Sequence, residues 1–157
     1  MKVEIKNYRT FQAHDGYGYE CSLYIDGERT AVITDDGYGE ELNWFPIGDH
    51  KSEQFQITGR RMHAFIEKCK ALPVYVTKEG WELDMSWELF LDDLVQLADI
   101  KAQAKGGKII IKEKEDGEFY TVGKGYKAKN RDRVLDAVAN NYPNAFLVNG
   151  CKVEATI

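Results

Sequence analysis

The dipeptide Asp26-Gly27 is the strongest constraint on the fold, because it lies between two runs of residues that favour β-strands. Residues 19–25 alternate apolar side chains with Glu20, Ser22 and Tyr24, which is the period of a half-buried strand. Asp-Gly favours a two-residue type I′ turn, in which both turn residues adopt positive φ angles. The sequence therefore predicts a β-hairpin in which residues 29–34 pair back on residues 19–25.

The same tetrapeptide occurs on both sides of this hairpin, as Asp15-Gly16-Tyr17-Gly18 and Asp36-Gly37-Tyr38-Gly39. A two-residue turn at Asp26-Gly27 places residue 16 opposite residue 37, so we expect the two copies side by side at the open end of the hairpin. A β-bulge would shift this pairing by one residue without separating the copies. The side chains expected to gather there are acidic and aromatic: Asp15, Tyr17, Asp35, Asp36, Tyr38 and Glu40, with His14 beside them.

This group of side chains has the composition of a protein-binding surface, and we expect it to contact a partner. Glycine frees the backbone, while tyrosine supplies a large amphipathic contact area at a low cost in conformational entropy. Two alternatives stay open: the carboxylates bind a hard cation through their oxygens, or the tetrapeptides are ordinary turns whose tyrosines pack on the sheet. The ligand spacing of an EF-hand loop is absent.

Three segments have the apolar spacing of amphipathic helices packed on a sheet. The first is expected to begin with Thr58 as its N-cap and to stop at Pro73. Ser86 is expected to cap the second, which ends at Gly106-Gly107. The third is expected over about residues 130–140.

The remaining segments predict short strands and loops, and residues 35–50 form a long loop or an edge segment. Together the pattern is that of an α+β fold of mostly antiparallel hairpins with about three amphipathic helices packed on the sheet. The predicted hairpins pair residues 74–77 with 81–85, residues 109–111 with 119–122 around Asp116-Gly117, and residues 146–148 with 151–153 around Asn149-Gly150.

Length and composition indicate one globular domain, residues 1–157, with a possible N-terminal β-rich lobe (1–78) and a C-terminal α/β lobe (80–157). Hydrophobic residues make up 43% of the chain and charged residues 30%, which is ordinary for a globular protein that folds alone. No run approaches the roughly 20 apolar residues of a membrane helix. Residues 1–6 alternate charged and apolar side chains, so a cytoplasmic location without a membrane partner is expected.

The three cysteines, Cys21, Cys69 and Cys151, lie far apart and form no CxxC pair. We expect reduced thiols, with Cys21 and Cys69 serving as small buried apolar residues. No zinc-ligand spacing accompanies them, and nothing in the sequence predicts a metal site or a cofactor.

The segment from 101 to 133 is strongly basic, with ten lysines and arginines against five acidic residues. Its glycine-rich stretch Gly123–Lys127 precedes a helix start, where backbone amides and the helix dipole could hold a phosphate. A solvated basic surface is the alternative, and an RNA or DNA footprint would add Lys101, Lys105 and Lys108. The candidate phosphate-binding residues are Lys124, Lys127, Lys129, Arg131 and Arg133.

Catalytic motifs are absent from the sequence. None of the serines lies in GxSxG, the histidines form no HExxH, and neither a Walker loop nor GxGxxG occurs. The sequence therefore argues against an enzyme and names no catalytic residues, while leaving open a small enzyme or ligand-binding site assembled only in three dimensions.

Several stretches of the chain are similar to small, mostly uncharacterised proteins encoded by phages, prophages and plasmids. They are Ile5-Lys6-Asn7, Ser22-Leu23-Tyr24-Ile25-Asp26-Gly27, Asp35-Asp36-Gly37-Tyr38-Gly39, and Trp87-Glu88-Leu89-Phe90-Leu91-Asp92-Asp93-Leu94 before a lysine-rich hairpin. The resemblance covers the larger part of the chain and implies no catalytic residues. It implies an accessory role for a mobile element, for which counter-defence by stoichiometric binding to a host protein is a common use.

The leading hypothesis is therefore a non-enzymatic binding protein of phage or mobile-element type that acts on a host protein, such as a component of a defence system. The alternative is a nucleic-acid-binding accessory protein that uses the basic segment 101–133. The sequence does not indicate whether the chain forms a homo-oligomer.

Overall fold

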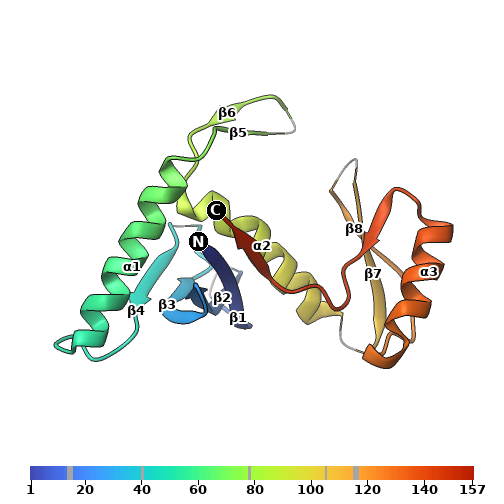
Figure 1. Ribbon diagram of the computed structural model, residues 1–157, viewed down its shortest axis with the longest axis horizontal. Coiled ribbons are helices and arrows are strands. Elements are labelled where there is room, and N and C mark those ends of the chain that lie inside the picture. The colour runs from blue at the N-terminus through green and yellow to red at the C-terminus, as the bar shows by residue number, and fades with distance from the viewer. Residues whose placement is uncertain (14–15, 40, 78, 105, 115–116) are drawn as a thin grey trace. The chain divides into compact units, whose positions relative to one another are not determined.

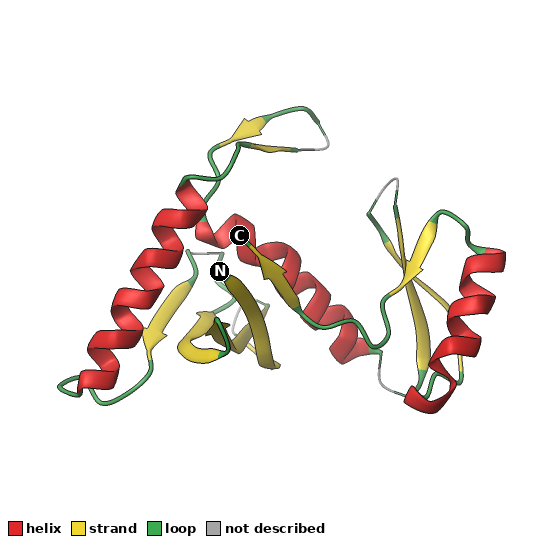
Figure 2. Cartoon of the chain, in the orientation of Figure 1, coloured by secondary structure: helices red, strands yellow, loops and turns green. Residues whose placement is uncertain are grey.

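The computed structural model describes residues 1–13, 16–39, 41–77, 79–104, 106–114 and 117–157 (Figure 1). The chain forms two compact units: Met1–Ala98 with Val153–Ile157, and Asp99–Lys152. Each unit has antiparallel strands and helices, which confirms the predicted α+β class (Figure 2). The lobes suggested by the sequence, 1–78 and 80–157, do not coincide with these units. Each unit packs around its own cluster of apolar side chains.

The first unit is built on a five-stranded antiparallel sheet in the order β10-β1-β2-β3-β4. The strand β10 comes from the C-terminal end of the chain and pairs with β1, with Val3 opposite Ala155. The edge strand β4 lies within the segment predicted as a loop or edge. The strands are β1 (Lys2–Gln12), β2 (Tyr17–Ile25), β3 (Glu28–Asp35), β4 (Asn43–Pro46) and β10 (Glu154–Thr156).

The predicted hairpin between β2 and β3 is confirmed, and so is its turn. Asp26 has a φ of 51° and Gly27 a φ of 85°, the positive values that a type I′ turn requires. Pairing begins with Ile25 opposite Glu28 and then shifts by one residue between Leu23 and Tyr24. This irregularity is the kind of bulge that moves the register without separating the strands.

Two helices complete the first unit: α1 (Glu53–Lys70) and α2 (Trp87–Gln103), whose residues up to Ala98 belong to it. The predicted start of α1 at Thr58 is wrong, because Ser52 is the N-cap and its Oγ accepts the N–H of Phe55 at 3.1 Å. Thr58 instead lies buried inside the helix, and its hydroxyl donates to the carbonyl of Ile47 at 2.9 Å. The predicted cap of α2 is confirmed, since the Ser86 Oγ accepts the N–H of Leu89.

The core of the first unit lies between the sheet and these helices. Leu23, Ile33, Phe65 and Leu91 are completely buried there, and the ring of Phe65 meets that of Phe90 edge-on at 5.7 Å. Cys21 and Cys69 are buried in the same core as free thiols. Burial raises the pKa of the Cys21 thiol to about 12 and that of Cys69 to about 11, so both stay protonated at neutral pH.

A short hairpin of β5 (Tyr75–Val76) and β6 (Glu82–Leu83) joins α1 to α2. Tyr75 pairs with Leu83 and Val76 with Glu82, as the sequence predicted. All four residues are exposed. Figure 1 shows the hairpin standing beyond the end of α1, clear of the five-stranded sheet.

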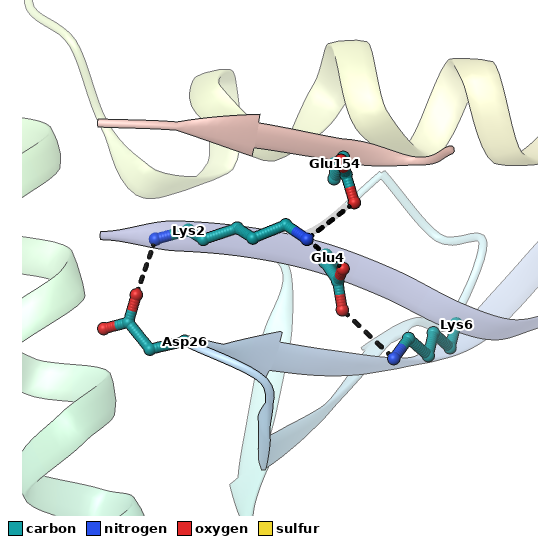
Figure 3. A network of polar contacts seen from close by, with 5 residues as sticks. All are labelled: Lys2, Glu4, Lys6, Asp26 and Glu154. Atoms are coloured by element: carbon teal, nitrogen blue, oxygen red, sulfur yellow. Dashed lines mark hydrogen bonds and ion pairs between the residues drawn. The ribbon is translucent and has the colours of Figure 1, made fainter. Parts of the chain in front are cut away.

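A line of charged side chains links β10 and β1 on one face of the sheet (Figure 3). The Lys2 ammonium lies 2.7 Å from Glu4 and 2.9 Å from Glu154, two carboxylates that face each other across the strand pair. Glu4 also pairs with Lys6 at 3.0 Å. Hydrogen bonds from Lys2 and Lys6 hold the pKa of Glu4 at about 2, well below its ordinary value of 4.5.

The second unit has a three-stranded antiparallel sheet in the order β8-β7-β9, and α3 packs against it. Its core consists of Ile111, Val134, Val138 and Leu147 with partly buried neighbours. The predicted hairpin of residues 109–111 with 119–122 and the predicted helix over 130–140 are confirmed. The elements are β7 (Lys108–Glu113), β8 (Phe119–Lys124), the 3-10 turn η1 (Ala128–Asn130), α3 (Arg131–Asn141) and β9 (Ala145–Leu147).

The predicted closing hairpin around Asn149-Gly150 is wrong. β9 pairs with β7 instead, and β10 pairs with β1 in the first unit. The side chain of Asn149 is buried and bonds to the backbone of β7, accepting the N–H of Ile110 at 2.7 Å and donating to the carbonyl of Lys108 at 2.8 Å. The Asn149 amide therefore satisfies the backbone N–H and C=O groups of β7 as a neighbouring strand would.

Candidate functional site

The described parts of the two tetrapeptides, residues 16–18 and 36–39, meet at the open end of the β2–β3 hairpin, as the sequence predicted. Gly37 lies so close that a side chain on it would begin 3.0 Å from the backbone of Tyr17 and Gly18. Gly37 also has a φ of 79°, which glycine adopts without steric cost. The register shift in the hairpin changes the pairing by one residue and leaves the loops adjacent.

Two aspartates shape the loop that carries Tyr38. The Oδ1 atom of Asp35 accepts the N–H of Gly37 at 2.8 Å, and the Oδ1 atom of Asp36 accepts the N–H of Tyr38 at 3.2 Å. Such bonds from an aspartate to the backbone two residues later stabilise a turn. The loop is therefore held by the same residues that supply its negative charge.

The tyrosines of the two copies are exposed to solvent, Tyr17 by 77% and Tyr38 by 55%. The alternative in which both pack on the sheet is therefore wrong. Together with Asp35 and Asp36 they form what we call the acidic-aromatic surface. Large aromatic side chains that project into water beside charges are typical of protein-binding surfaces.

Phe11 adds an aromatic ring that the sequence analysis did not include. It stands opposite Gly18 in the β1–β2 pair and is 44% exposed. A side chain on Gly18 would begin 2.6 Å from the Phe11 ring and 2.5 Å from the Asp35 carbonyl. Gly18 is thus the residue that lets the ring lie across the strand, a cross-strand arrangement that covers a glycine in a sheet.

Asp92 on α2 is a further acidic residue, close enough to Tyr19 of β2 for its charge to act on the phenol. Tyr19 is half-buried, and burial together with the charges of Cys21, Asp35, Tyr8 and Asp92 raises the pKa of its phenol. Partial burial and the neighbouring Asp93 raise the pKa of Asp92. No sequence signal could have placed Asp92 here, because its position depends on how α2 packs on the sheet.

Three members of the predicted group, His14, Asp15 and Glu40, lie outside the described residues. Over the residues that are described, no three His, Cys, Asp or Glu side chains gather as metal ligands would. The structure thus brings together Tyr17, Asp35, Asp36 and Tyr38 from the predicted set.

The β5–β6 hairpin is a second exposed apolar feature of the first unit. Trp81 is 71% exposed and Val76 57%. Thr77 accepts the N–H of Gly80 on its carbonyl and that of Trp81 on its hydroxyl. The other exposed apolar side chains here are Val74, Tyr75 and Leu83. Three successive apolar residues, Val74–Val76, were the available sequence signal.

The basic stretch of the second unit is more ordered than the sequence suggested. The N–H groups of Gly125 and Tyr126 both donate to the carbonyl of Gly107, and the N–H of Lys127 donates to the side chain of Asn130 at 2.7 Å. These amides were candidates for holding a phosphate, and all three already have acceptors. These three amides therefore have no free N–H to offer an anion.

The five predicted phosphate-binding residues separate into two groups. Lys124 and Arg133 line a groove of about 540 Å³ between β8 and α3, whereas Lys127, Lys129 and Arg131 are exposed outside it. The Arg131 guanidinium lies 3.9 Å from Asp132. The Lys101 ammonium donates to the Cys151 carbonyl, so it is engaged within the fold.

Among the described residues, none of the helices has the length and apolar character needed to span a membrane. The chain matches no protein-family model, no curated protein and no solved structure.

Proposed function

We propose that this chain is a non-enzymatic binding protein that acts by stoichiometric contact with another protein through the acidic-aromatic surface. The observation that carries the proposal is that Tyr17, at the start of β2, and Tyr38, in a loop held by Asp35 and Asp36, are both largely exposed and lie on adjacent segments. A preformed loop loses little conformational entropy on binding, so more of the contact energy is retained as affinity.

The charge of this surface favours a basic partner. Tyrosine anchors contribute desolvated contact energy, while carboxylates accelerate encounter and fix orientation. The exposed hairpin with Trp81 is a second candidate contact surface of the first unit, because a strand pair with apolar side chains in water is typical of such surfaces.

The biological setting of the proposal follows from the sequence resemblance to phage, prophage and plasmid proteins. In that setting the partner is a host protein in the cytoplasm, and blocking a defence component is the counter-defence role we propose. Two buried, protonated cysteine thiols are in keeping with a binding role, because they offer no thiolate nucleophile.

The test is purification of a tagged full-length chain from its own host, with the Tyr17→Ala/Tyr38→Ala double variant alongside it. Phe146→Ala is the matched control, because Phe146 is an exposed aromatic residue of the second unit. We expect the chain and the Phe146→Ala variant to retain one protein in a stoichiometric amount, and the double variant to lose it. Retention of the same protein by a folded double variant would contradict the proposal.

Nucleic-acid binding is the second candidate function, and the exposed cations Lys127, Lys129 and Arg131 favour it. A phosphate contact must weaken steeply as salt rises, because neutralised phosphates release counterions. We expect weak or no binding to single- or double-stranded nucleic acid. Micromolar affinity with a steep salt slope that Lys124→Glu and Lys127→Glu abolish would favour this second candidate over protein binding.

A further inference from the structure

The groove of the second unit lies between the edge strand β8 and one face of α3. Its α3 residues recur at helical spacing from Arg133 to Asn141, and Lys124 contributes from the end of β8. The volume of about 540 Å³ is within the range of sites for small organic molecules. The groove belongs to the second unit alone, so it is independent of the acidic-aromatic surface.

The floor of the groove is aliphatic and continues the second core. Val134 and Val138 are core residues that also line the groove, and Ile109 and Val122 pack against that core from the sheet. Filling the groove with an apolar group would remove this surface from water, which stabilises the bound state by the hydrophobic effect.

The charge of the groove is entirely positive. Lys124 and Arg133 line it, and no aspartate or glutamate is among its lining residues. Within the described part of the chain, neither cation forms an ion pair with a carboxylate. Two unpaired cations beside an apolar floor favour an anionic group, and Arg133 can hold a carboxylate or a phosphate through two parallel hydrogen bonds.

The far end of the groove is polar and open. Asn141 and Tyr142 line this end. Asn141 follows Arg133 by eight residues, which corresponds to about 12 Å along the helix axis at 1.5 Å per residue. The ligand chemistry that matches is a charged head, an extended apolar body and a distal end near water.

We propose that this groove binds a small amphipathic organic anion, with its carboxylate or phosphate head on Lys124 and Arg133 and its apolar body over Val134, Ala137 and Val138. A nucleic-acid strand fits less well, because its sugar hydroxyls would be buried on an aliphatic floor without acceptors. The N–H groups of Gly125, Tyr126 and Lys127 are already bonded, so these three add nothing for a chain of phosphates.

The test measures binding of decanoate and of decyl phosphate to the full chain by calorimetry, below the concentration at which either forms micelles. Decyltrimethylammonium carries the same tail with a positive head, and inorganic phosphate is a head without a tail. We expect saturable binding of at least one decyl anion and none of the two comparison compounds. The stronger of the two anions identifies the head group.

Variants locate the bound anion. Arg133→Gln should weaken binding by about tenfold, the loss of one charged hydrogen-bonding contact, while Lys129→Gln outside the groove should leave it unchanged. Ala137→Phe should fill the groove and abolish binding. Ala139→Phe is its matched control, because Ala139 is an exposed residue of α3 that does not line the groove. Circular dichroism checks that each variant is folded.

Four results would overturn the proposal. Two concern the site and the charge: Ala137→Phe binds as well as the unaltered chain, or the cationic decyl compound binds as well as the anionic ones. The other two concern the ligand: inorganic phosphate binds as tightly as decyl phosphate, or neither decyl anion shows saturable binding. In the last case, binding of a single-stranded oligonucleotide that Arg133→Gln abolishes would assign the groove to nucleic acid.

Discussion

The two units of this chain differ in where their apolar side chains lie. Over the described residues, the core cluster of the first unit contains fifteen buried apolar side chains and that of the second contains four. The first unit nevertheless exposes Tyr17, Tyr38 and Trp81 to solvent. The second leaves an aliphatic groove open beside its small core. A unit with a complete core can display aromatic residues outward, whereas a small unit with an open groove gains stability when a ligand fills it.

Truncating the core of the first unit is the largest perturbation we expect. Phe65→Ala removes a fully buried aromatic side chain and should cost about 3–5 kcal/mol of unfolding free energy. Hydrogen exchange should accelerate at the amides of β2, β3 and α1 and stay unchanged in β7 and α3, since the cores are separate. Equal acceleration in both units would show that they unfold as one.

The corresponding weak point of the second unit is a polar side chain. Asn149→Ala leaves the N–H of Ile110 and the carbonyl of Lys108 without their partner, so the unfolding free energy should fall by about 1–3 kcal/mol. Urea unfolding measures the loss, with Asn140→Ala as an exposed control. If Asn149→Ala lowers the unfolding free energy no more than the control does, water replaces the hydrogen bonds of the amide without loss of stability.

A substitution at Gly18 tests whether the Phe11 ring packs across this glycine beside the acidic-aromatic surface. Gly18→Ala forces the Phe11 ring and the Asp35 carbonyl to move and should cost about 1–3 kcal/mol through overpacking. Gly16→Ala is the matched control, because the added carbon would meet only the Gly37 carbonyl, at 3.7 Å. The two thermal unfolding curves should separate clearly, and coincident curves would show that the ring does not rest on Gly18.

The smallest effect concerns pH. The pKa of Glu4 is lowered from 4.5 to about 2 in the fold, so its ion pairs stabilise the protein fully above 4.5. This contribution is lost as the pH falls from 4.5 towards 2. The stability difference between the chain and Glu4→Gln in urea should therefore shrink over that interval. A pH-independent difference would contradict the lowered pKa.

The sequence was most informative where one residue pair or one period decides the local structure. Asp26-Gly27 predicted the turn, and the hairpin then predicted that the two tyrosine loops would be neighbours. Apolar spacing located the later turns of α1. It missed the start of α1 because the residues between Ser52 and Thr58 are mostly polar and carry no apolar stripe.

The remaining features depend on distant parts of the chain, and local patterns do not encode them. Asn149-Gly150 resembles a hairpin turn, yet the Asn149 side chain is used by β7. The position of Phe11 opposite Gly18 depends on the β1–β2 register, and that of Asp92 near Tyr19 depends on how α2 packs. The groove between β8 and α3 required both elements in place, although Lys124 and Arg133 were already candidates for binding an anion.

The central claim, that the acidic-aromatic surface binds a protein, is tested most directly by the association and dissociation rates of the co-purified partner. Tyr38→Ala should raise the dissociation rate, a loss of about 2 kcal/mol for an anchor residue. Asp36→Asn keeps an oxygen for the Tyr38 N–H, so it should mainly slow association, and less so at high salt. If both rates are unchanged in both variants, the partner binds elsewhere and the claim is wrong.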